Sequence, residues 1–272
     1  MNKLGVLLIS IFVALVAFHF LIIRPEKFET TDLYDEMMER GYIKVGINVD
    51  SKPFGFLDEK GEVCGYDADL ARHISKYIFP NKPQSIFFVP VTPNNRLIKI
   101  STGEVDIVIA TMTITPQREQ IINFSIPYDS AGQAILVKKS SQITSLADLA
   151  DQNVGVVWGT TAEKNVRNLI PSANMTGYKT YLEAFRALKR DEIIALTSDD
   201  TILSRFVQED KEVRMLPKRY TKEPYGIGFR QGKGADKFKN VLDYAINDLK
   251  QRSVISRLHK KWLGSDFDKG NL

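Results

Sequence analysis

The spacing of apolar residues along the chain changes repeatedly between the period of a strand and that of a helix. Ile43–Ile47 alternates apolar residues with polar or small ones and predicts a strand. From Tyr66 onward, apolar residues recur at helical spacing and place Leu70 and Ile74 on one face, which predicts an amphipathic helix. Val105–Ala110 is almost entirely apolar, as is typical of a strand that helices cover on both faces of a parallel sheet.

The same alternation continues to the end of the chain. Further strands are expected at Ser85–Val91, Gln133–Val137, Val154–Trp158, Met175–Lys179, Glu192–Leu196 and Val213–Leu216. Further helices are expected after Thr92–Asn95, after Gly159, and at Leu182–Lys189, Thr201–Val207, Asp236–Leu249 and Val254–Trp262. Strands that alternate with helices in this order predict an α/β fold with doubly wound sheets.

The pattern restarts near the middle of the chain, which predicts two such lobes. Residues 43–135 and 223–272 are assigned to lobe 1, because the C-terminal helices are expected to return to it. Residues 136–222 form lobe 2, and two crossing hinge segments near 131–140 and 217–226 join the lobes. Residues 28–42 form a charged spacer with a short helix.

The N-terminal segment, residues 1–27, contains a long apolar run without charge, Leu4–Ile23, that ends at Arg24 and Pro25. This length spans a bilayer, whereas the cores of signal peptides have about 7–15 residues. An uncleaved signal anchor, one N-terminal apolar helix, is therefore favoured, with a cleaved signal peptide as the alternative. Either alternative exports the remainder, so we expect an extracytoplasmic protein, in the periplasm or at the cell surface, tethered by this helix.

Composition narrows the class of function. Of the 272 residues, 43% are hydrophobic and 26% charged, which suits two lobes with proper cores. The net charge of +4 is small and mixed with acidic residues, which argues against nucleic-acid binding. Cys64 is the single cysteine, so no intrachain disulfide forms and a half-buried thiol is expected. Metal-ligand spacings are absent, and no cofactor is expected.

One stretch suggests a binding site for an anion. Thr115 suits the N-cap of a helix and Pro116 its first position, so Arg118 falls in the first turn. A cation there opposes the helix macrodipole, whereas an anion is stabilised by the free backbone N–H groups. We therefore expect Arg118, the neighbouring threonines and the helix start to hold a carboxylate at the end of a strand, where open α/β sheets bind ligands. The alternative is a surface arginine paired with Glu119 or Asp129.

Several blocks of the sequence, in order, are similar to one known family. They are Pro53–Phe56, Gly65–Leu70, Asn95–Leu97, Gly103–Asp106, Ala110–Arg118, Asn123–Tyr128, Gly159–Thr161 and Tyr225–Ile227. Together they resemble the extracytoplasmic amino-acid-binding proteins of ABC importers, solute-binding protein family 3, over residues 43–263. The resemblance implies the type II periplasmic-binding-protein fold, in which two lobes close on a ligand. It also implies that an amino acid is the ligand and that ABC permease subunits are the partners of a monomeric protein.

The resemblance assigns roles to six positions, which are Arg118, Thr113, Thr161, Asp199, Ala110 and Thr111. The first three bind the α-carboxylate of the ligand, with the arginine as a bidentate partner that lysine cannot replace. The last three bind the α-ammonium through a carboxylate, a backbone carbonyl and a hydroxyl. A zwitterion would then bridge the lobes and favour their closure. For Asp199, an ordinary N-cap is the alternative.

Selection of the ligand side chain depends on other positions. Aromatic residues that sandwich the ligand in some relatives are replaced here by Ser51 and Pro93. An arginine at the position of Arg96 is found in members that bind glutamate or aspartate, and the alternative is a solvated arginine at a helix start. Asn48 replaces a residue that is often charged and would hydrogen-bond an acid or an amide. Glutamate or aspartate is therefore expected as the ligand, with glutamine still possible.

Two other classes of function remain open. An enzyme on the same fold would resemble cyclohexadienyl dehydratases or lytic transglycosylases, which need a general acid or base in the cleft. Neither His73 nor His259 lies near an expected cleft loop, so no catalytic residue is assigned. A sensory protein that acts through a membrane partner is the second alternative.

Overall fold

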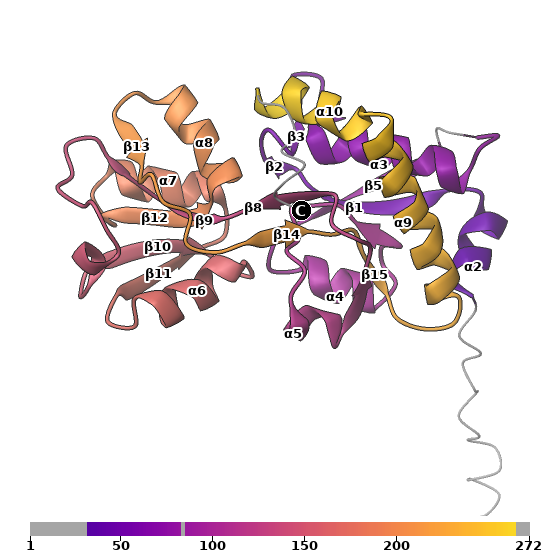
Figure 1. The fold of residues 1–272 in the computed structure, drawn as a ribbon, viewed down its shortest axis with the longest axis horizontal. Helices are drawn as coiled ribbons and strands as arrows, with labels where there is room; N and C mark the ends of the chain where they lie inside the picture. Colours follow the sequence, from indigo (N-terminus) through magenta and orange to yellow (C-terminus); the bar gives the residue numbers. More distant parts are fainter. Residues whose placement is uncertain (1–31, 83–84, 265–272) are drawn as a thin grey trace, which may run out of the picture.

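The computed structural model describes residues 32–82 and 85–264. Two α/β lobes lie side by side, and two strands cross between them near the centre of Figure 1. The predicted fold class, two α/β lobes with two crossing segments, is confirmed. The predicted N-terminal apolar helix lies outside the described residues. Within those residues, no helix has the length and apolar character needed to span a membrane.

The first lobe is built on a mixed five-stranded sheet. Its order is β5 (Ile86–Val91), β1 (Ile43–Asn48), β6 (Ile107–Val108), β15 (Gly228–Arg230) and β7 (Ile122–Phe124). Strand β1 is parallel to both of its neighbours, whereas β15 is antiparallel to both of its own. Its helices are α2 (Leu33–Arg40), α3 (Tyr66–Ile78), α4 (Arg96–Ser101), α5 (Pro116–Glu119), α9 (Ala235–Gln251) and α10 (Val254–Leu263). A small sheet of β2 (Asp50–Ser51), β3 (Gly55–Leu57) and β4 (Val63–Cys64) completes it.

The second lobe repeats this architecture with a different edge. Its sheet has the order β11 (Asn174–Tyr178), β10 (Asn153–Val157), β12 (Ala195–Asp199), β9 (Gln133–Lys138) and β13 (Val213–Met215). Three α-helices cover it, α6 (Thr161–Leu169), α7 (Tyr181–Lys189) and α8 (Asp200–Glu209), and a short 3₁₀ helix, η1 (Ala147–Leu149), precedes β10. Strand β9 lies in this sheet from its first residue.

The crossing strands are β8 (Asp129–Ala131) and β14 (Glu223–Tyr225), which pair antiparallel. Because β8 runs directly into β9, and β15 follows two residues after β14, each strand connects the sheets of both lobes. Any movement of one lobe relative to the other therefore bends or twists the chain at these two short strands.

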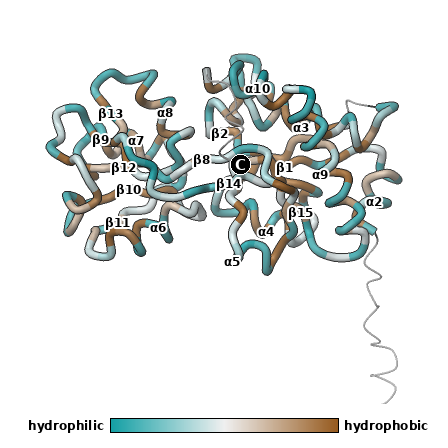
Figure 2. The backbone as a smooth tube through the Cα atoms, viewed as in Figure 1, coloured by the Kyte–Doolittle hydropathy of each residue, from teal (hydrophilic) through white to brown (hydrophobic). Residues whose placement is uncertain are grey.

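Hydrophobic residues lie in the strands and on the inner faces of the helices in both lobes, as the brown segments of Figure 2 show. The expected spacer is part of this packing, because Leu33 and Met37 of α2 are buried in the main core. That core contains residues of both lobes, including Phe54 from one and Tyr181 from the other. The two lobes are thus in contact in a closed arrangement.

Two predicted strands have different bounds in the structure. The strand expected at Val105–Ala110 comprises only Ile107 and Val108. Asp106, directly before it, accepts a hydrogen bond from Lys44 N through its carboxylate at 2.7 Å. The strand expected at Glu192–Leu196 is β12, which runs from Ala195 to Asp199. Asp199 is therefore the last residue of β12 and lies at the carboxyl end of the middle strand of this sheet.

Candidate ligand-binding cleft

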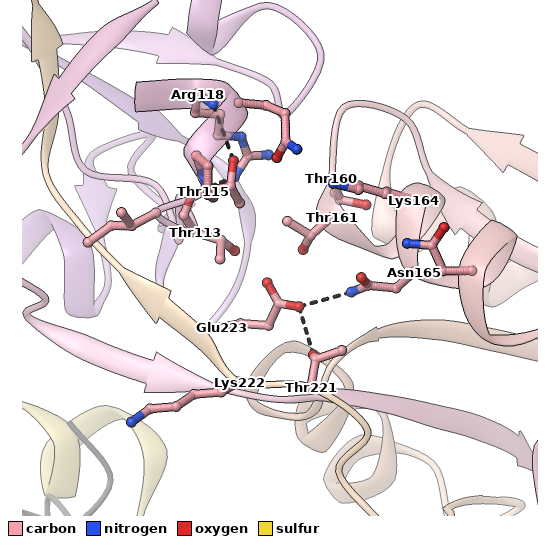
Figure 3. A pocket seen from close by; sticks show the side chains of 14 residues that line it. Thr113, Thr115, Arg118, Thr160, Thr161, Lys164, Asn165, Thr221, Lys222 and Glu223 are labelled. Atoms are coloured by element: carbon pink, nitrogen blue, oxygen red, sulfur yellow. Dashed lines mark hydrogen bonds between the residues drawn. The ribbon is translucent and has the colours of Figure 1, made fainter. Parts of the chain in front are cut away.

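A cavity of about 520 Å³ lies between the lobes, beside the crossing strand β14. In Figure 3, Arg118 and Thr113 face it from the first lobe, Thr161 and Asn165 from the second, and Glu223 from β14. The side chains that line it are mostly polar or charged. Such a cavity suits a small polar ligand that contacts both lobes.

Arg118 connects the two walls of this cleft. Thr115 caps α5 by accepting from Arg118 N at 3.3 Å, and Pro116 is the first helical residue, as predicted. The guanidinium donates to Thr113 O at 2.8 Å and, across the cleft, to Gly159 O at 3.1 Å. Burial lowers the pKa of Arg118 to about 9. The alternative of a surface ion pair is wrong, since neither expected acidic partner lies within ion-pair distance in the described part of the chain.

The threonines lie around this guanidinium. Thr113 bridges to Tyr225 and its side chain lines the cavity, as does that of Thr161 at the start of α6. Thr111 is held in a left-handed conformation with φ 46°, and its N–H donates to Asp67 Oδ2 at 3.1 Å. A threonine with positive φ is strained, and the buried Asp67 acceptor stabilises it here.

Thr160 and Glu163 have the spacing of a capping box, but none is formed. The Thr160 hydroxyl donates instead to Val157 O at 2.7 Å, and no side chain caps α6. The N–H groups at the start of this helix are therefore open toward the cleft, next to Thr161.

Asp199 is buried and does not cap α8 with its side chain, although it occupies the N-cap position. Its Oδ2 accepts from the hydroxyl of Tyr225 at 2.5 Å. Burial, reinforced by the nearby charge of Glu223, raises the pKa of Asp199 to about 7. The ordinary N-cap interpretation is therefore wrong, and a cationic group beside Asp199 would stabilise its charged form.

Arg96 is 3% exposed, so the alternative of a solvated arginine is wrong. Its Nη1 donates to the carbonyl oxygens of Ala110 and, at 3.4 Å, Thr111. Its Nε is buried and has no hydrogen-bond partner within the described residues. Burial lowers the pKa of Arg96, while Tyr181 and Asp199 favour its charge. The guanidinium thus lies buried outside the lining of the cavity, with one donor unpaired among the described residues.

Asn48 is also buried, at the end of β1. Its Nδ2 donates to Ser51 Oγ at 2.6 Å, and its Oδ1 accepts from Asp50 N at 3.0 Å. These bonds close the turn into β2, so the structure gives Asn48 a role in the loop backbone. Cys64 is half-buried, as predicted.

A ring of buried and half-buried polar residues beside the cavity was missed in the sequence. Asn165 Nδ2 donates to Gln133 Oε1 at 2.6 Å and to Glu223 Oε1 at 2.9 Å. Thr221 Oγ1 donates to the same Glu223 oxygen at 2.7 Å and accepts from Gln133 N at 3.0 Å (Figure 3). This ring connects α6 to both crossing segments. The available signal was the presence of polar residues in both crossing segments, Gln133 in the first and Thr221 and Glu223 in the second.

The lobes are in close contact at Gly159. A side-chain carbon there would lie 2.5 Å from Pro93 O and 2.6 Å from Asn94 Cα in the opposite lobe. Gly159 also has φ +79°, a conformation that glycine adopts without strain. Lys52 and Glu209 add an ion pair across the lobes at 3.9 Å.

This fold, with two α/β lobes enclosing a polar cleft at two crossing strands, defines a two-lobed solute-binding protein. The chain matches the family described as bacterial extracellular solute-binding proteins, family 3, over residues 43–265, and it belongs to that family. The family predicted from the sequence is therefore confirmed.

Individual relatives agree with this assignment. The chain is 34% identical to the ABC transporter glutamine-binding protein GlnH of Bacillus subtilis (strain 168), covering 82% of each chain. It is 38% identical to a glutamine-binding protein of Geobacillus stearothermophilus, over 73% of this chain and 76% of that relative. Its fold is similar to the crystal structure of the ancestral amino-acid-binding protein AncCDT-1, a precursor of cyclohexadienyl dehydratase, with TM-score 0.78, 33% identity, and coverage of 85% and 99%.

Proposed function

We propose that this chain is the extracytoplasmic substrate-binding protein of an ABC importer and that it captures a polar α-amino acid. The observation that carries the proposal is a pair of opposite charges from the two lobes. Arg118 lines the cavity from the first lobe, and Asp199, buried at the end of a strand of the second lobe outside the cavity lining, favours the charged form of Arg118. The α-carboxylate binds Arg118 and the open start of α6, and the α-ammonium binds Asp199, so the ligand stabilises the closed form.

Glutamine is the ligand that the cleft and the relatives favour together. Arg96 Nε offers one unpaired donor, which suits the single oxygen of an amide. Nη1 of Arg96 already donates to the carbonyls of Ala110 and Thr111. Two relatives with 34% and 38% identity are named as glutamine-binding proteins.

Glutamate and aspartate, which the sequence analysis favours, form the second candidate. The observation in their favour is the buried charge of Arg96, which a side-chain carboxylate would neutralise. A carboxylate would, however, compete with the two carbonyl oxygens for the guanidinium.

The test is a calorimetric titration of the full chain with each of the twenty amino acids. We expect glutamine to bind most tightly, glutamate and aspartate to follow, and arginine and the apolar amino acids to bind weakest. Tighter binding of arginine or of an apolar amino acid would contradict the ligand assignment. Binding of no amino acid would contradict the function itself.

Transport is distinguished from catalysis and sensing by separate measurements. With prephenate or arogenate, we expect no turnover, and turnover would favour the dehydratase alternative that the AncCDT-1 likeness raises. In liposomes with its ABC permease, the liganded chain should stimulate ATP hydrolysis. Stimulation of a membrane kinase instead would indicate a sensor.

The N-terminal apolar run is proposed to tether the protein to the membrane. If it does, the protein stays in the membrane fraction after a high-salt wash, because an apolar helix of this length spans the bilayer. A mature N-terminus between residues 18 and 28, found by mass spectrometry, would show a cleaved signal instead.

A further inference from the structure

Glu223 brings a buried carboxylate to the lining of the cleft. It is the first residue of the crossing strand β14 and is 4% exposed. Of the residues that line the cavity in the described part of the chain, it is the single acid. Lys164 and Lys222 also belong to this lining, but both are exposed, so their charges are screened by solvent and salt. The Glu223 carboxylate is therefore the buried negative charge that a ligand in the cavity meets.

The two oxygens of this carboxylate have different surroundings. Oε1 accepts from Asn165 Nδ2 at 2.9 Å and from Thr221 Oγ1 at 2.7 Å, and these two bonds fix the side chain from α6 and from the crossing segment. Oε2 has no hydrogen-bond partner among the described residues. In Figure 3 it is turned away from both donors, toward the space beside Thr113 and Thr161. One oxygen thus holds the carboxylate in place, and the other is an acceptor directed into the cavity.

Arg118 and Glu223 lie on opposite sides of the cavity in Figure 3, with Thr113 and Thr161 between them. An amino acid whose α-carboxylate binds Arg118 can extend its side chain across this space toward Glu223 Oε2. The proposed function gives the α-ammonium to Asp199, so the donor that remains for Oε2 belongs to the ligand side chain. A side-chain amide supplies two N–H donors, whereas an ionised carboxylate supplies none.

We propose that Glu223 is a specificity-determining residue whose Oε2 accepts a hydrogen bond from the side-chain amide N–H₂ group of bound glutamine. This inference rests on the proposed function of amino-acid capture and names the group that selects glutamine over glutamate. Glutamate is rejected because its side chain brings a like charge to Glu223 and no donor. The cationic side chain of arginine is disfavoured because it shares the cavity with Arg118, whose like charge repels it.

The experiment compares three ligands of similar shape by calorimetry on the full chain. They are glutamine, glutamate and 5-oxonorleucine, in which a methyl group replaces the amide nitrogen of glutamine. We expect glutamine to bind about tenfold more tightly than 5-oxonorleucine, because only glutamine donates to Glu223. Glutamate should also bind more weakly than glutamine. Equal Kd values for glutamine and 5-oxonorleucine, or tighter binding of glutamate than of glutamine, would overturn the inference and leave amino-acid capture standing.

Glu223→Gln supplies a second readout. The new amide keeps an oxygen for Asn165 and Thr221 and replaces Oε2 by a donor. We therefore expect the ratio of the Kd for glutamate to the Kd for glutamine to fall about 100-fold, as glutamine loses its acceptor and glutamate gains a donor. The control is Glu192→Gln, at an exposed glutamate paired with Arg190 outside the cavity lining, and it should leave this ratio unchanged.

The possible outcomes separate the inference from the proposed function. Equal losses for all three ligands in Glu223→Gln would overturn the inference, because Glu223 would then contact the α-ammonium or only support the ring. Failure of the unmodified chain to bind any amino acid would instead overturn the proposed function. Thermal unfolding of Glu223→Gln close to that of the unmodified chain verifies the fold. If the substitution unfolds the chain, the comparison of glutamine with 5-oxonorleucine on the unmodified chain decides the matter.

Discussion

Arg118 uses one N–H of each terminal nitrogen on a backbone carbonyl, one in each lobe. The planar guanidinium can do this and still present further donors to a carboxylate, because it has five N–H groups in a fixed plane. In the first turn of α5 its positive charge does not stabilise the helix, so we assign its role to the cleft.

Arg118→Lys should therefore weaken amino-acid binding while leaving the fold intact. Hydrogen bonds to charged groups contribute about 1.5–3 kcal/mol, so we expect the Kd to rise about 10- to 150-fold. Titration calorimetry measures this change. Arg190→Lys, at an exposed arginine paired with Glu192, is the matched control and should bind normally. An unchanged Kd in Arg118→Lys would remove the residue from the site.

The sequence pointed to charged candidate residues more readily than to neutral ones. Arg118 and Arg96 were recognisable because a cation at a helix start contradicts local preference or matches a family block. Asn165 was missed because its partners Gln133 and Glu223 are far from it in the sequence. Asn48 stays a predicted ligand contact, and its bonds to Ser51 and Asp50 depend on a loop conformation that spacing does not reveal.

At the scale of elements, α6 joins three parts of the site. Its open N-terminus faces the cleft, its preceding glycine contacts the other lobe, and Asn165 holds both crossing segments. A substitution in α6 should therefore affect the crossing segments, and a substitution in the crossing segments should affect ligand binding.

Asn165→Ala would leave Gln133 Oε1 without this donor and Glu223 with Thr221 alone. Unpaired buried polar groups cost about 1–3 kcal/mol, so we expect the free energy of unfolding to fall by that amount. Urea unfolding followed by circular dichroism measures it. Asn168→Ala, on the same helix and exposed, should have no comparable effect. Equal stability of both variants would show that the ring contributes little.

Gly159→Ala tests the close contact between the two lobes at Gly159. The new side-chain carbon would collide with the Pro93 carbonyl only when the lobes are closed, so the closed population and the apparent affinity should both fall. Small-angle scattering should show no compaction when the amino acid is added. Gly41→Ala is the control, because Gly41 has a similar φ of +76° but nothing within 4 Å of the added carbon. It should cost about 1 kcal/mol of stability and no affinity.

The order of elements was predictable because each strand and helix has its own apolar period. The bounds were less predictable, since β6 comprises only Ile107 and Val108 and β12 extends to Asp199. The capping box at Thr160 fits the local sequence, yet its hydroxyl bonds to Val157 O instead. Local pattern describes an element, while contacts between elements decide where it ends.

At the scale of the whole molecule, buried carboxylates lie in the first lobe, in the second lobe and in a crossing strand. Burial raises the pKa of Asp67 and Asp199 to about 7 and that of Asp129 to about 6, against an ordinary value of 3.8. Asp67 accepts from Tyr128 and Thr111, and Asp129 lies in the crossing strand β8 with His259 at 3.6 Å. Carboxyls in both lobes and in the crossing strand β8 therefore titrate over a similar pH range.

The sign of this response follows from the direction of the shifts. A carboxyl with a higher pKa in the folded chain binds protons more strongly when folded, so its stabilisation is present at low pH and is lost as pH rises through about 7. The lowered pKa of His73 acts in the opposite direction, but below its ordinary value of 6.5. The ligand-free protein should thus become more stable as pH falls from about 8 to about 6.5.

Ligand binding should lower the pKa of Asp199 and favour its deprotonated form, because an α-ammonium beside it stabilises the carboxylate. Near pH 6.5 binding then releases a fraction of a proton, and affinity rises with pH up to about 7. Calorimetry in two buffers of different ionisation enthalpy measures that release. Asp199→Asn should abolish it along with most of the affinity, whereas Asp129→Asn, outside the ligand contacts, should retain it. Proton uptake on binding would show that Asp199 does not meet the ammonium group. A stability of the ligand-free protein that rises with pH across this window would contradict the raised pKa of the buried carboxyls.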